Sequence, residues 1–195
     1  MRQNLKEKPW FLIVSFIMII LLSGEVVLLA IQNKKLKATI ESFTNPTYLL
    51  KTGDKAESIN VKTLNGYEDS ITYNDSTKRY LLFILSTNCP HCLNNLPKWK
   101  EIAYSQYTEN VDIFGISISE LEETKKYYYE KDVSFNLLVP DTSFSRKYKI
   151  SGVPLTLMVS GSGFIDKSWI GELNENQVNE IKGLLGVILH PNVIN

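Results

Sequence analysis

Residues 79–92 carry the stretch RYLLFILSTNCPHC, in which a run of apolar residues leads into a pair of cysteines. The apolar part, Arg79–Leu85, has the length of a strand and no alternation, which is typical of a strand buried on both faces. Cys89 and Cys92 are the only two cysteines of the chain. Two cysteines placed at random would have this spacing about once in a hundred sequences, so the pair indicates a site.

A C-x-x-C motif between a strand and a helix indicates redox chemistry, because the loop it closes is too short to stabilise a fold much. Cys89 is predicted to be the nucleophile, since a helix N-terminus stabilises a thiolate through unpaired N–H groups and the helix dipole. Cys92 lies one turn further into the helix, so we expect it to be shielded and to resolve the mixed disulfide. The alternatives are a static disulfide or half of a metal site.

Pro90 and His91 separate the two cysteines, and we expect them to tune the stability of the Cys89 thiolate. His91 can donate a hydrogen bond or add positive charge near the Cys89 sulfur, which would favour the reduced form and raise the redox potential. The alternative is that His91 is simply an exposed residue at the start of the helix.

Residues 10–31 form a nearly continuous apolar run near the N-terminus. A helix of this length spans roughly 33 Å, enough to cross the hydrocarbon core of a bilayer. A cleaved signal peptide is the alternative, but no A-x-A-like cleavage site follows, which favours an uncleaved anchor. Basic residues are equally frequent on both sides of the run, so charge alone does not set its orientation.

The remaining sequence suggests one folded domain behind the anchor. We expect a short N-terminal tail (1–9), the transmembrane anchor (10–31), a polar stalk (32–49), the folded domain (50–187) and a C-terminal tail (188–195). Lysine plus arginine and aspartate plus glutamate are balanced at 21 each. No nucleic-acid partner is therefore expected. With two histidines and two cysteines, a closed zinc site without carboxylates would need all four of these side chains, and no metal is expected.

The pattern within the domain predicts alternating strands and helices. Residues 58–64 alternate as a half-buried strand does, and Asn65-Gly66 is a strong hairpin signal. The further predicted elements are a helix from the cysteines to Tyr107, strands at 111–118 and 135–139, helices at 120–131 and 142–148, a hairpin of strands 154–159 and 164–170, and a helix to Leu185. The alternating centre predicts parallel strands and the last hairpin adds antiparallel ones, so the class is α/β with a mixed sheet.

Residues from about 50 to 187 resemble the thioredoxin superfamily and are most similar to the membrane-anchored TlpA/ResA-type thiol–disulfide oxidoreductases of the redoxin group. The strand–C-x-x-C–helix arrangement is one shared feature. Pro97 is the second, since the family has a proline that kinks the active-site helix at this position. The sequence GVPLT at residues 152–156 matches the family's cis-proline loop. The resemblance implies a thioredoxin-like fold, a central mixed sheet flanked by helices, with one additional helix–strand pair.

The resemblance also implies how the protein works. Pro154 would be cis, and the backbone of Val153 would pair with an extended client segment. The redox-active disulfide Cys89–Cys92 would serve in place of a bound cofactor. The partners would be a cysteine-containing client protein, a membrane electron donor or acceptor protein, and the lipid bilayer, which residues 10–31 would cross. The soluble domain would lie on the extracytoplasmic side of a bacterial cell membrane.

The sequence departs from the family at several positions. Phe83 stands where ordinary thioredoxins have a buried acid, and Asn95 where many cytochrome-maturation reductases have glutamate, so the proton-transfer group stays open. Most of these relatives reduce their clients, for example apocytochrome c in cytochrome c maturation. The Pro90-His91 dipeptide, in contrast, is that of DsbA-type oxidants, so the direction of electron transfer also stays open.

Two other functions are compatible with the cysteine pair. A peroxiredoxin-like peroxidase would have P-x-x-x-T/S-x-x-C, in which Ser86 fits but Leu82 replaces the proline. A copper-binding chaperone could use both cysteines and a histidine, since thiolates favour Cu(I). Copper carriers on this fold, however, have a wider cysteine spacing. The cluster Tyr127-Tyr128-Tyr129 is expected to serve packing rather than binding.

Overall fold

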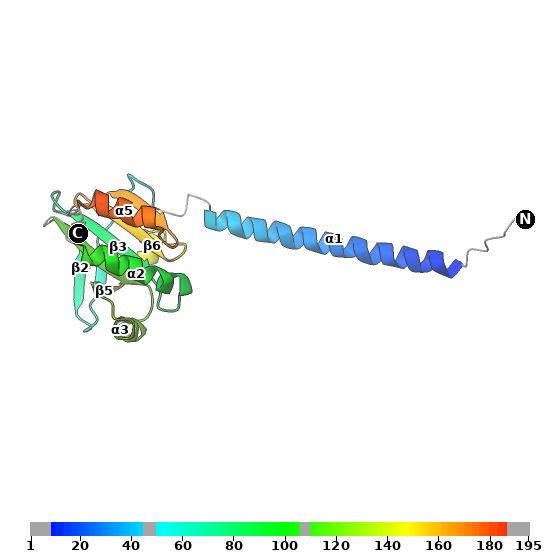
Figure 1. The fold of residues 1–195 in the computed structure, drawn as a ribbon, viewed down its shortest axis with the longest axis horizontal. Coiled ribbons are helices and arrows are strands. Elements are labelled where there is room, and N and C mark those ends of the chain that lie inside the picture. Colours follow the sequence, from blue (N-terminus) through cyan, green and yellow to red (C-terminus); the bar gives the residue numbers. More distant parts are fainter. Residues whose placement is uncertain (1–8, 45–49, 106–109, 187–195) are drawn as a thin grey trace, which may run out of the picture. The chain divides into compact units, whose positions relative to one another are not determined.

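The computed structural model describes residues 9–44, 50–105 and 110–186, and the chain divides into two units, residues 1–45 and 46–195. In the first unit, helix α1 (Pro9–Thr44) is continuous over 36 residues (Figure 1). Its segment Leu12–Lys35 is long and apolar enough to cross a membrane, as a membrane anchor or a signal sequence would be. The helix continues past residue 31 into the predicted stalk, because residues 32–44 contain no glycine or proline to end it. Residues 45–49 of that stalk lie outside the described residues.

The second unit contains a seven-stranded mixed sheet in the order β2-β1-β5-β4-β3-β6-β7. Its strands are β1 (Ile59–Lys62), β2 (Glu68–Ile71), β3 (Arg79–Leu85), β4 (Val111–Ser117), β5 (Asn136–Pro140), β6 (Leu155–Ser160) and β7 (Ile165–Ile170). Its helices are α2 (Pro90–Tyr104), α3 (Leu121–Glu130), α4 (Phe144–Lys147) and α5 (Glu175–Leu184). Strands β3, β4 and β5 are parallel, and the other pairs are antiparallel. This arrangement confirms the predicted α/β class and the predicted order of elements.

The element boundaries differ from the predicted ones by a few residues. The first strand is shorter than 58–64, because the chain already turns at Thr63, whose N–H donates to the carbonyl of Tyr67. Gly66 adopts φ of 84°, which explains the Asn-Gly signal of this hairpin. Helix α2 ends at Tyr104 rather than continuing to Tyr107, which lies outside the described residues. An additional helix–strand pair lies between α2 and β6, as predicted.

Strand β3 is the centre of the sheet and is buried on both faces, as its apolar run predicts. Leu81, Phe83 and Leu85 contribute to one core, together with residues of α2, α3 and α5. Leu82 and Ile84 contribute to the opposite core, together with residues of β1 and α4. Strand β3 ends shortly before Cys89. Because the strand is packed on both faces, its end holds the start of the cysteine segment in one place.

Helix α2 is held on the sheet by Trp99, which is fully buried. Its ring stacks on Phe83 at a centroid distance of 5.3 Å, and its Nε1 donates to Oγ1 of Thr156 at 2.9 Å. Truncating a buried tryptophan to alanine typically costs about 3–5 kcal/mol. Residues of α2 and α5 share one core, so both helices cover the same face of the sheet (Figure 1).

Candidate active site

Cys89 is the N-cap residue of α2, which is the position that the sequence predicts for it. Its Sγ accepts the backbone N–H of Cys92 at 3.1 Å, and its carbonyl accepts the N–H of Leu93 at 3.2 Å. The side chain is half-buried, and both cysteines are free thiols. A sulfur at this place meets the unpaired N–H groups of the first helical turn, which stabilise a thiolate.

The segment between β3 and Cys89 is held by Ser119, which follows the neighbouring strand β4. Oγ of Ser119 lies 3.1 Å from Oγ of Ser86 and accepts the backbone N–H of Thr87 at 3.0 Å. The N–H of Cys89 then donates to the carbonyl of Ser86 at 3.2 Å. These bonds connect the end of β4 to the turn that presents the first cysteine.

Cys92 differs from Cys89 in its surroundings. Its side chain is fully buried against the core between the sheet, α2 and α5. Burial, together with the hydrogen bond to Cys89, raises the pKa of Cys92 to about 12. At neutral pH this thiol therefore keeps its proton, while the half-buried sulfur of Cys89 remains within reach of solvent.

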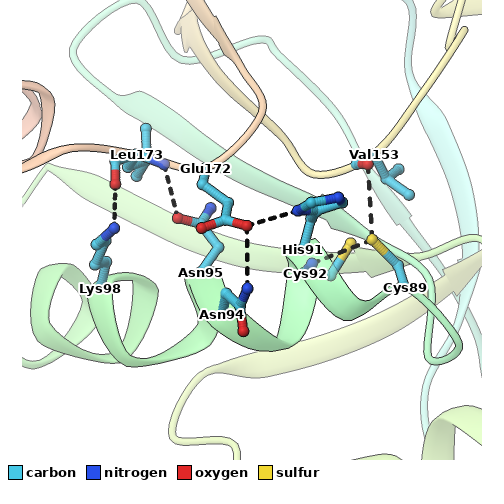
Figure 2. Close-up of polar contacts among 9 residues, drawn as sticks. All are labelled: Cys89, His91, Cys92, Asn94, Asn95, Lys98, Val153, Glu172 and Leu173. Carbon is cyan, nitrogen blue, oxygen red and sulfur yellow. Dashed lines mark hydrogen bonds and ion pairs between the residues drawn. The ribbon is translucent and has the colours of Figure 1, made fainter.

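The loop before β6 contacts the first cysteine. The peptide bond between Val153 and Pro154 is cis, as predicted. The carbonyl oxygen of Val153 lies 3.7 Å from Sγ of Cys89 and accepts its hydrogen bond (Figure 2). Pro154 is tied to the end of β7, because its carbonyl accepts the N–H of Gly171 at 2.8 Å. The structure thus brings Val153 and Pro154 to the cysteine pair, although they lie far from it in the sequence.

His91 is not bonded to Cys89, as one of the sequence-based interpretations would require. Its Nδ1 lies 2.7 Å from Oε1 of Glu172, in the loop between β7 and α5 (Figure 2). The same carboxylate oxygen accepts Nδ2 of Asn94 at 3.2 Å. Hydrogen bonds from His91 and Asn94 hold the pKa of Glu172 below its usual range. The interpretation of a direct His91–Cys89 bond is thereby corrected, because the loop offers the imidazole a carboxylate.

The loop residue after Glu172 also bonds to α2. The N–H of Leu173 donates to Oδ1 of Asn95 at 2.9 Å, and the carbonyl of Leu173 accepts a hydrogen bond from Nζ of Lys98. We call residues 172–173 the strap, since the pair binds four side chains of α2: His91, Asn94, Asn95 and Lys98 (Figure 2). The strap fixes the loop against the first three turns of α2, the helix that Cys89 caps and that contains Cys92.

Comparison with known proteins places this site in a family. Residues 52–168 match the model of the AhpC/TSA family. The chain belongs to the AhpC/TSA family. No curated protein sequence matches it.

Solved structures similar to this AhpC/TSA protein share its fold. The thioredoxin domain of a thiol-disulfide oxidoreductase from Bacteroides vulgatus is 22% identical, with a TM-score of 0.58 over 70% of this chain and 99% of that one. A putative thiol:disulfide interchange protein DsbE from Chlorobium tepidum is 17% identical, with a TM-score of 0.60 over 70% and 99%. A secreted disulfide oxidoreductase from Mycobacterium tuberculosis is 15% identical, with a TM-score of 0.53 over 65% and 95%. The fold is therefore thioredoxin-like.

Around the cysteines of this AhpC/TSA protein, two buried polar groups lack a hydrogen-bond partner among the described residues. They are Nδ2 of Asn95 and the hydroxyl of Tyr127. Burial and the nearby cysteines, Cys92 more than Cys89, raise the pKa of Tyr127 to about 12. Tyr127 packs in the same core as Cys92, whereas Tyr129 of the predicted packing cluster is exposed.

Glu172 and Leu173 were not predicted from the sequence. Neither residue belongs to a motif, and no local signal of charge or periodicity distinguishes Glu172 from the other acids of the chain. For the copper-binding alternative, no group of three or more His, Cys, Asp or Glu side chains suited to a metal occurs within residues 9–44, 50–105 and 110–186. The second histidine, His190, lies outside those residues.

Proposed function

We propose that the protein is a thiol–disulfide oxidoreductase of the membrane-anchored TlpA/ResA type, which exchanges electrons with cysteines of client proteins through Cys89 and Cys92. The main support for this proposal is that the two sulfurs differ in burial. Cys89 is half-buried at the N-terminus of α2, and Cys92 is fully buried. Burial also raises the pKa of Cys92 to about 12. Such a pair has one sulfur suited to attack and one suited to resolve.

The proposed exchange transfers two electrons and needs no bound cofactor. In the reducing direction, the Cys89 thiolate attacks a client disulfide, a mixed disulfide forms, and the displaced client sulfur takes a proton. Cys92 then loses its proton and attacks Sγ of Cys89, which releases the second client thiol and leaves a Cys89–Cys92 disulfide. The oxidising direction is the reverse of these steps.

Val153 and Pro154 are proposed to bind the client backbone beside the reacting sulfur. The support is the position of the Val153 carbonyl, 3.7 Å from Sγ of Cys89. A client segment in extended conformation next to this loop would bring its own cysteine within reach of Cys89. Pro90 and His91 are proposed to tune the thiolate from within the first turn of α2.

The proposed location is the extracytoplasmic side of a bacterial cell membrane. Residues 10–31 would be the anchor, 32–49 the stalk and 50–187 the catalytic domain, between terminal tails at 1–9 and 188–195. The apolar segment Leu12–Lys35 supports an anchor. The similar M. tuberculosis oxidoreductase is described as secreted, which agrees with an extracytoplasmic site of action.

Reduction of insulin disulfides by dithiothreitol tests the proposal. The wild-type chain should accelerate the reaction, and Cys89→Ser should abolish the acceleration, because no second sulfur is positioned to attack. Ser105→Ala is a suitable control, since Ser105 is the C-cap of α2 at the far end of the helix. Full activity of Cys89→Ser would exclude the nucleophile assignment.

A further inference from the structure

The interaction between Glu172 and His91 determines which ring nitrogen carries a proton. Glu172 accepts hydrogen bonds from His91 and Asn94, and these bonds keep its carboxyl ionised. An ionised carboxylate has no proton to donate, so Nδ1 of His91 is the donor in the 2.7 Å contact. In a neutral imidazole whose Nδ1 carries the proton, the lone pair lies on Nε2.

The second ring nitrogen of His91 is available to a client. None of the described residues forms a hydrogen bond with Nε2, and the His91 side chain is 73% exposed. His91 lies in the first turn of α2, two residues after the N-cap Cys89. In the view of Figure 2 its ring lies between the Glu172 carboxylate and the cysteine pair. A thiol that approaches Sγ of Cys89 therefore arrives at the helix turn that also carries this imidazole, which a carboxylate holds.

Among the described residues, few other charged groups surround His91 and Glu172. Lys98 of α2 bonds to the carbonyl of Leu173 and acts electrostatically on Glu172. The sulfurs of Cys89 and Cys92 are the titratable groups on the other side. Residues 151–155 of the cis-proline loop carry no titratable side chain. From α5, Glu175 in the first turn is the nearest acid along the chain.

We propose that His91 and Glu172 form the proton-transfer dyad of the exchange reaction, with Nε2 of His91 as the base for the client thiol and Glu172 as the residue that positions it. This inference rests on the proposed thiol–disulfide exchange. It supplies the proton-transfer group that Phe83 and Asn95 cannot provide, because neither side chain titrates.

The oxidising step shows how the dyad acts. The client thiol gives its proton to Nε2, and its sulfur forms a bond with Sγ of Cys89 while the Cys89–Cys92 bond breaks. The electron pair of that bond stays on Cys92, which takes up a proton from water, and the imidazolium returns its proton to water. A second client thiol then displaces Cys89 and completes the two-electron transfer. In the reducing direction, the imidazolium protonates the client sulfur that leaves.

A pH profile tests the dyad. The probe is a synthetic peptide with two cysteines, reacted in single turnover with the oxidised full-length protein in detergent between pH 6 and 9.5. Glu172→Gln should slow the reaction about tenfold at pH 6.5, which is less than the roughly 10²–10⁴-fold that general-base catalysis contributes as a whole, because the variant removes the positioning residue and leaves the imidazole in place. The rates should converge with wild type near pH 9.5, where the peptide thiols ionise without a base. Glu175→Gln removes the same charge three residues away and should leave the profile unchanged.

Further outcomes separate the dyad from a purely structural role of Glu172 and from failure of the proposed function. His91→Ala, which removes the base itself, should lose at least as much rate at low pH, and adding Glu172→Gln to it should cause no further loss. In one contrary result, Glu172→Gln loses the same fraction of its rate at every pH; in another, a changed redox equilibrium with glutathione explains its loss. Either result would overturn the dyad and leave the exchange function intact. A wild-type protein that neither oxidises the peptide nor, in its reduced form, reduces the peptide disulfide at any pH would overturn the proposed function itself.

Discussion

The carboxylate of Glu172 lies 2.7 Å from Nδ1 of His91, although 81 residues separate the two in the sequence. This contact takes the place of the bond between His91 and the Cys89 sulfur that the C-P-H-C motif suggests. It also sets a negative charge beside any positive charge that the imidazole acquires. The motif therefore has a different electrostatic setting here from the one its sequence alone would indicate.

This setting leads to a prediction about the direction of electron transfer. We expect a redox potential more negative than about −180 mV, compared with about −120 mV for DsbA, because Glu172 offsets the charge that would favour the reduced form. Equilibration of the purified protein with glutathione buffers at pH 7 gives the value. A potential above about −180 mV would contradict the prediction, and one below about −250 mV would identify a reductant.

A Cys92→Ser variant should accumulate mixed disulfides with its clients. Without the buried resolving thiol, the bond between Cys89 and the client sulfur can be broken only by another thiol. Non-reducing electrophoresis of membranes from cells that express the variant, followed by mass spectrometry of the captured bands, identifies the partners. The double variant Cys89→Ser, Cys92→Ser is the matched control and should capture none. Equal bands from both variants would mean that Cys89 is not the attacking sulfur.

Alkylation should distinguish the two thiols over a wide pH range. Only a thiolate reacts, and a thiol with a pKa of about 12 is ionised in only about one molecule in ten thousand at pH 8. The raised pKa means that the proton is kept as pH rises and is lost only near pH 12. Iodoacetamide should therefore modify Cys89 at least about 100-fold faster than Cys92 at pH 8, measured by mass spectrometry of peptides. In urea the rates should become equal; equal rates in the folded protein would refute the assignment.

Replacing Asn95 should lower the free energy of unfolding far more than replacing its neighbour Asn94. Replacing Asn95 with alanine leaves the N–H of Leu173 without its 2.9 Å acceptor in a buried place. Such a loss costs about 1–3 kcal/mol of the free energy of unfolding. Asn94→Ala removes only an exposed hydrogen bond, and its cost should stay within about 0.5 kcal/mol. Urea denaturation of residues 46–195 measures both, and similar costs would contradict the strap's role.

Peroxide consumption by the purified protein should be low. The AhpC/TSA match leaves a peroxidase as the alternative function, but Leu82 occupies the position of the motif's proline and is fully buried within β3. The side chain of Ser86, which does fit the motif, is bonded to Ser119. Turnover of hydrogen peroxide with dithiothreitol, compared with the Cys89→Ser variant, is the measurement. Rapid turnover that depends on Cys89 would favour the peroxidase.

The features that local sequence determines were predicted well. The bounds of β3 follow from its unbroken apolar run, and the first hairpin follows from Asn65-Gly66. The position of Cys89 at the start of α2 follows from the strand before it and Pro90 after it, since proline suits the first turn of a helix. The cis bond at Pro154 was predicted only from the resemblance of its loop to the thioredoxin superfamily.

The features that depend on tertiary contacts were not predicted. Glu172 and Leu173 reach α2 only because α2 and α5 cover the same face of the sheet. Of the three adjacent tyrosines, Tyr127 enters the core, and the spacing of a helix alone does not select it. The hydrogen bonding of His91 depends on these same long-range contacts.

The strap has a consequence for the order in which the contacts of the site can form during synthesis. Residues 172 and 173 are synthesised long after the cysteines that they help to position. A ribosome must therefore release nearly the whole domain before the dithiol acquires its final environment. A nascent chain that stops short of the β7–α5 loop lacks the contacts of Glu172 and Leu173 with α2, so the surroundings of the two thiols stay incomplete until that loop has been synthesised.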